Sequence, residues 1–286
     1  MVRCYLAGNM VHDAVLLAFY DGCAAEKKLT TDWHYQPSDI AVVFGVYKSK
    51  VPVSYPRGTV IAEQRKRGLD VIVLETGYIN RGDGETHHYA AGFNGLNGRA
   101  DFRNEDSPDD RAAKFPVQLL PWRRDGKHVL LCGQVPWDAS VDHINFNAWL
   151  SVARESLARV TERPVRFRPH PQIAKPDMSL EEDLEDCWAV VTFNSNAAVD
   201  AAIRGVPVFA ADAGSMAYPI ANKDLSHIEI PSTPERKQWL NNLAYTQWTQ
   251  EEMRQGLTWA HLSRSPAHAS TETNASTSTS ALTPAG

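Results

Sequence analysis

The chain has 286 residues, of which 43% are hydrophobic and 22% are charged, and its formal net charge is −5. This composition is typical of a globular protein, and the negative net charge argues against a general polyanion binder. Every apolar run is shorter than the roughly 20 residues that cross a bilayer, and the apolar part of the N-terminus is too short for a signal peptide. We therefore expect a cytoplasmic protein without a transmembrane segment.

In the first part of the chain, apolar runs of strand length alternate with helix-like stretches. Val2–Ala7, Ile40–Val46 and Val71–Glu75 are the expected strands, and Met10–Lys28 and Tyr55–Arg67 are the expected helices. The order strand, helix, strand predicts a parallel sheet covered by helices on both faces.

The alternation lapses between residues 76 and 116, a stretch rich in Gly, Asn, His and Asp. A loop of that length in a compact α/β protein is usually functional or disordered. The adjacent His87 and His88 do not predict a metal site, because neighbouring residues rarely converge on one ion. The four cysteines also lack metal-ligand spacing and are expected to be reduced and buried.

A linker is expected near Gly126, and after it expected strands and helices alternate again. Its expected strands are His128–Cys132, Val165–Phe167, Ala189–Phe193 and Pro207–Ala210. Its expected helices are Val141–Val160, Leu180–Asp186, Ala197–Arg204 and Glu235–Ala244. We therefore predict an α/β protein with two Rossmann-like domains, residues 1–125 and 126–262, in which residues 235–262 pack back across the first domain. The Ser/Thr/Ala/Pro-rich residues 263–286 are expected to form a disordered tail.

Ligands of open α/β sheets bind at the carboxyl ends of the strands, and three such ends in the second domain carry polar residues. The first, after residues 129–132, contains Gln134, Asp138 and Ser140 behind the flexible Gly133. A carboxylate here can act as a nucleophile or base towards a sugar. The alternative is that Asp138 or Ser140 caps the following helix.

The second strand end reads Arg168-Pro169-His170-Pro171. Two prolines fix the backbone on either side of His170. Arg168 and His170 can both donate hydrogen bonds to phosphate oxygens, so this element is a candidate donor-binding site.

The third strand end leads from Thr192 through Asn194, Ser195 and Asn196 into a helix. Small polar residues that open a helix after a strand are typical of phosphate binding, although Asn194 or Ser195 can also serve simply as an N-cap. Asp200, one turn further on, is within reach of a ribose hydroxyl.

The order Gly-Gln-x-x-x-Asp-x-Ser, Arg-Pro-His-Pro and Asn-Ser-Asn leading to Arg-Gly-Val-Pro-Val resembles the bacterial capsule-synthesis glycosyltransferases, which include the retaining β-Kdo transferases. These motifs span about residues 128–212. The resemblance implies a GT-B fold and a transferase whose co-substrate is a CMP- or UDP-linked sugar, with no other cofactor. The acidic stretches Asp83-Gly84-Glu85 and Asp109-Asp110 do not form a DxD motif at a strand end, so we expect the transferase to be metal-independent. The resemblance assigns His170, Ser195 and Asn196 to the donor and Asp138, with Gln134 beside it, to catalysis.

The chain is also similar to small phage-encoded glycosyltransferases, whose acceptor is often hydroxymethylpyrimidine DNA. A basic stretch in the first domain is compatible with an anionic acceptor. Lys48, Lys50 and Arg57 are expected in a loop with Pro52 and Pro56, and they are the residues expected to contact such an acceptor. A surface glycan is the alternative acceptor, and the sequence decides neither the acceptor, nor the stereochemical outcome, nor the oligomeric state.

The function predicted from the sequence is therefore transfer of a sugar from a nucleotide-sugar donor to an acceptor hydroxyl. The alternative from another class is a non-catalytic nucleotide-binding or scaffold protein on a GT-B-like fold. Asp138 distinguishes the two, because a binder needs His170 and Ser195 but no carboxylate directed at the sugar.

Overall fold

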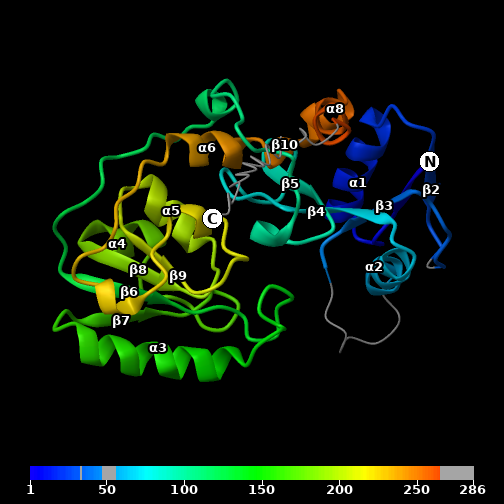
Figure 1. The fold of residues 1–286 in the computed structure, drawn as a ribbon. Coiled ribbons are helices and arrows are strands. Elements are labelled where there is room, and N and C mark those ends of the chain that lie inside the picture. Colours follow the sequence, from blue (N-terminus) through cyan, green and yellow to red (C-terminus); the bar gives the residue numbers. More distant parts are fainter. Residues whose placement is uncertain (33, 47–55, 265–286) are drawn as a thin grey trace, which may run out of the picture.

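The computed structural model describes residues 1–32, 34–46 and 56–264 of the chain. Their strands form two separate sheets, each with helices packed against it (Figure 1). We call the first sheet with its helices and loops the first half, and the second sheet with its helices and loops the second half. The predicted α/β class with two Rossmann-like domains is confirmed. Lys48, Lys50 and residues 265–286 of the expected tail lie outside the described residues.

The first sheet has six strands, of which β1 to β4 run parallel to one another. β5 is antiparallel to β4, and β10 is antiparallel to β5, so this sheet is mixed. In spatial order the strands are β10 (Gln247–Thr249), β5 (His88–Phe93), β4 (Asp70–Thr76), β3 (Ile40–Phe44), β1 (Val2–Tyr5) and β2 (Lys27–Thr30).

Helices cover both faces of the first sheet (Figure 1). Alternate residues of β3 and β4 point to opposite faces, and both sets are apolar, as parallel strands buried on both sides require. One face carries α1 (Met10–Gly22), α7 (Gln250–Arg254) and α8 (Leu257–Leu262), and the other carries α2 (Pro56–Lys66). The expected helix to Lys28 was too long, because α1 ends at Gly22 and the chain then forms β2.

The four strands of the second sheet are all parallel. In spatial order they are β7 (Val165–Arg168), β6 (His128–Cys132), β8 (Cys187–Thr192) and β9 (Val208–Ala210). α3 (Phe146–Val160) covers one face, while α4 (Leu180–Glu185), α5 (Ala197–Ile203) and α6 (Lys237–Ala244) pack on the other. The four cysteines are all free and buried, as expected.

After α6 the chain returns to the first half, where β10 pairs with β5. The expectation that the C-terminal segment packs back is thus confirmed for residues 247–262. Gln247 is fully buried, and its Oε1 accepts hydrogen bonds from Tyr78 N (2.8 Å) and Ile79 N (3.0 Å). These bonds fix the start of the β4–β5 loop, whose side chains Tyr78 and Ile79 pack into the core of the second half.

Among the described helices, none is long and apolar enough to cross a membrane.

Candidate active site

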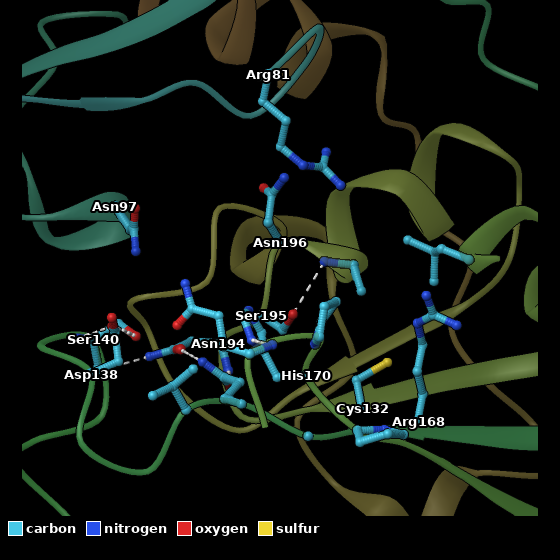
Figure 2. A pocket seen from close by; sticks show the side chains of 18 residues that line it. Arg81, Asn97, Cys132, Asp138, Ser140, Arg168, His170, Asn194, Ser195 and Asn196 are labelled. Carbon is cyan, nitrogen blue, oxygen red and sulfur yellow. Dashed lines mark hydrogen bonds between the residues drawn. The ribbon is translucent and has the colours of Figure 1, made fainter. Parts of the chain in front are cut away.

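A cavity of about 440 Å³ lies at the carboxyl ends of β6, β7 and β8, and residues of the first half also line it. Figure 2 shows Arg81 and Asn97 entering from the first half and the remaining labelled residues coming from the second. All the predicted catalytic and donor residues except Asp200 line it, namely Gln134, Asp138, Arg168, His170, Pro171, Asn194, Ser195 and Asn196. Three strand ends that are far apart in the sequence therefore meet at one cavity.

Gly133 permits the close approach of the first two strand ends. Its N–H donates to Arg168 O at 2.8 Å, and a Cβ at this position would lie 3.0 Å from the ring of Phe167. A larger residue would make a tight contact with this ring and with Arg168 O, which would lie 3.3 Å from the Cβ.

Gln134 and Asn194 bind each other across the cavity wall. Gln134 Nε2 donates to Asn194 Oδ1 at 2.6 Å, and Asn194 N donates to Gln134 Oε1 at 2.9 Å. Asn194 Nδ2 also donates to Ser140 O and to Asp212 Oδ1, each at 2.8 Å. Both side chains are buried, so their geometry ties the loop after β6 to the loop after β8 and holds Asp138 in position.

Asp138 is exposed at the cavity, and its Oδ1 accepts from Ser140 N at 2.8 Å and from Ser140 Oγ at 2.7 Å. The chain continues from here through turns, and α3 begins only at Phe146. Asn145 caps α3, its Oδ1 accepting from Ala148 N at 3.1 Å. The alternative that Asp138 or Ser140 caps this helix is therefore wrong.

Two titratable groups lie within the electrostatic reach of Asp138. Burial lowers the pKa of His170, and the negative charge of Asp138 partly offsets this effect. Burial raises the pKa of Glu75 in the first half, and the charge of Asp138 raises it further. The charge of Asp138 thus acts on an imidazole of its own half and on a carboxyl of the other half.

Glu75 is a functional candidate that the sequence reasoning missed, although it ends the strand expected over residues 71–75. Its Oε1 accepts from Thr76 N at 2.8 Å. The signal in the sequence is its place at the carboxyl end of a central parallel strand. The candidate residues of the second half follow strands at the same kind of position.

Ser195 and Asn196 lie between β8 and α5. Ser195 Oγ accepts from Ala197 N at 3.3 Å, which leaves the hydroxyl hydrogen for another acceptor. Asn196 Nδ2 donates to Tyr78 O at 3.1 Å and so links the third strand end to the first half.

The two basic side chains that line the cavity are both engaged by carboxylates. Arg168 forms an ion pair with Asp183 and donates to Met178 O at 2.8 Å, and its side chain is only 14% exposed. Arg81 forms an ion pair with Asp200, which does not itself line the cavity.

Arg57 does not lie in the expected loop. It is in the first turn of α2, is buried, and its Nη1 donates to Phe44 O at the end of β3. Within the described ranges, no group of three or more His, Cys, Asp or Glu side chains could hold a metal ion.

No protein-family model matches the chain, and no curated protein matches it. Among solved structures, it is similar to the β-Kdo 2,7 transferase of KpsC from Thermosulfurimonas dismutans, with a TM-score of 0.53 and 15% identity, over 91% of this chain and 99% of that one. It is also similar to the β-Kdo 2,4 transferase of KpsC from that organism, with a TM-score of 0.53 and 13% identity, over 85% and 89% of the two chains. The chain thus has a GT-B-like fold.

Proposed function

We propose that this protein is a glycosyltransferase that moves a sugar from a nucleotide-sugar donor to an acceptor hydroxyl. The observation that carries the proposal is the cavity between the halves, where Asp138, His170, Ser195 and Asn196 meet at three parallel strand ends. A cleft between two Rossmann-like halves is a common site for a nucleotide ligand, and the GT-B-like fold of the two KpsC structures agrees with this assignment.

In the proposed reaction, the bond between the anomeric carbon and the donor phosphate oxygen breaks, and the nucleotide leaves with the electron pair. The acceptor oxygen forms the new bond to the same carbon and loses its proton. Ser195 and His170 would donate hydrogen bonds to the phosphate, the latter as a neutral imidazole because burial lowers its pKa.

Asp138 would act on the sugar. If configuration is retained, its carboxylate attacks the anomeric carbon and forms a covalent intermediate; if configuration is inverted, it accepts the proton of the acceptor hydroxyl. Glu75 at the end of β4 is the second candidate proton acceptor, because burial and the charge of Asp138 raise its pKa and so make its carboxylate a stronger base.

For the acceptor, we propose a glycan hydroxyl. Arg57, one of the three cations expected to meet an anionic acceptor, is buried and donates to a backbone carbonyl. The names of both KpsC structures specify Kdo transfer, which agrees with glycan chemistry. Hydroxymethylpyrimidine DNA remains the acceptor to be tested against it.

The test is release of nucleotide from a panel of CMP- and UDP-linked sugars, with glycan acceptors and with hydroxymethylated DNA. We expect acceptor-dependent release from at least one donor. Tight nucleotide binding without turnover of any donor would instead favour a non-catalytic nucleotide-binding protein.

A further inference from the structure

The β4–β5 loop brings a cation of the first half to the cavity. Arg81 lines the cavity beside Asn196, and Figure 2 shows its side chain reaching down from this loop towards the second half. The loop is held at its start by the two hydrogen bonds to Gln247, so Arg81 projects from a fixed base.

The hydrogen bonds of Arg81 leave part of its guanidinium unused by the protein. Nη1 donates to Tyr78 O at 3.1 Å and to Asp200 Oδ1 at 3.0 Å, and Nη2 donates to Asp200 Oδ2 at 2.6 Å. These bonds use three of the five N–H groups of a guanidinium. The side chain is 38% exposed, so a ligand in the cavity can approach the remaining donors.

The other cation that lines the cavity is less available. Arg168 is 14% exposed, and its guanidinium faces Asp183, which is itself only 11% exposed. His170 carries no net charge at neutral pH, because burial lowers its pKa. Of the described residues that line the cavity, Arg81 is thus the cation best placed to meet a negative ligand group.

We propose that Arg81 donates a charge-assisted hydrogen bond to the phosphate of the nucleotide donor, so that the first half completes the donor site of the second. The inference rests on the proposed function and names a further donor-binding residue for it. Asp200 orients the guanidinium through two oxygens, and its negative charge opposes the phosphate. Because Arg81 belongs to the other half, phosphate binding also adds a contact between the halves.

The test compares the affinities of three variants for CMP and UDP by titration calorimetry. Arg81→Gln keeps a polar side chain but removes the charge, and we expect it to weaken binding by about ten- to a hundredfold. Asp200→Asn keeps an acceptor for Arg81 but removes the opposing charge, so we expect it to bind as tightly as the wild type or more tightly. Arg204→Gln removes an exposed arginine that pairs with Glu181 outside the cavity, and it should bind like the wild type.

A purely structural role of the Arg81–Asp200 pair predicts that both substitutions weaken binding, because each removes the ion pair that links the halves. That result, or unchanged binding by Arg81→Gln, would overturn the inference while leaving the proposed function standing. Failure of the wild type to bind any nucleotide would overturn both. Unfolding midpoints of the variants should match the wild type, which separates loss of binding from loss of fold.

Discussion

At the scale of single residues, the proposed reaction depends most on the carboxylate of Asp138. The contacts of its Oδ1 with Ser140 hold the carboxylate at the cavity, and no helix depends on it as a cap. We expect Asp138→Asn to lower kcat by about a thousandfold or more while the Kd for CMP or UDP stays near the wild-type value, because the proposed function makes this carboxylate the group that acts on the sugar and gives it no contact with the phosphate. Asp142→Asn, an exposed carboxylate in the same turn, is the control and should leave kcat unchanged.

Glu75 gives a second prediction, on the pH dependence of stability. Burial and the charge of Asp138 raise the pKa of Glu75, so the folded protein holds this proton at a pH where the unfolded chain has lost it. The contribution of Glu75 to stability is full below its unfolded pKa of about 4.3 and is lost as the pH rises through the higher folded value. Glu75→Gln removes this loss, so its free energy of unfolding relative to the wild type should increase from pH 4.5 to pH 7.5 in urea titrations. A difference that does not change with pH would contradict the raised pKa.

At the scale of helices and strands, the contact between α1 and α7 depends on one glycine. A Cβ on Gly22 would lie 1.8 Å from Met253 O, 2.7 Å from Gly256 N and 2.9 Å from Arg254 O. All three are backbone atoms and cannot turn away, so we expect Gly22→Ala to cost about 1–3 kcal/mol or more of unfolding free energy. Gly58→Ala in α2 is the matched control, because no atom lies within 4 Å of its added Cβ, and it should stabilise by about 0.5–1 kcal/mol. Equal effects of the two substitutions in urea unfolding would contradict this account.

Some of the strands and cavity residues can be predicted from the sequence, and others cannot. β6 and β8 were predictable, because a continuous apolar run indicates a parallel strand buried on both faces. β2, with Lys27 and Lys28, and the three-residue β10 carry no such signal, and their pairing is decided by neighbouring strands. The residues of the second half that line the cavity followed from the rule that ligands bind at strand ends. Arg81 did not, because its place at the cavity depends on how the β4–β5 loop crosses to the other half.

At the scale of the whole molecule, the chain passes from the first half to the second and then returns to the first. Arg111 holds the returning segment in place. Its buried guanidinium donates to Ala244 O at 3.2 Å and to Gln247 O at 2.8 Å. It also pairs with Glu252 at 2.8 Å and lies 3.8 Å from the ring centre of Trp248. One side chain therefore holds α6, β10 and α7 where the chain re-enters the first half.

We therefore expect Arg111→Met to destabilise the protein by about 3–5 kcal/mol, because the substitution removes the charged partner of Glu252 and takes a donor from two buried carbonyls. The loss should be local to the returning segment, so amide hydrogens of β10 and β5 should exchange faster, while those of β6 and β8 in the second sheet stay protected. Hydrogen exchange followed by mass spectrometry measures the exchange rates of both sheets.

Arg254→Met is the control, since this arginine is 37% exposed and its pairs with Glu85 and Glu251 are on the surface. This substitution should cost less than about 1 kcal/mol. Uniformly faster exchange in both sheets would show instead that the two halves unfold as one unit and that Arg111 stabilises the molecule as a whole.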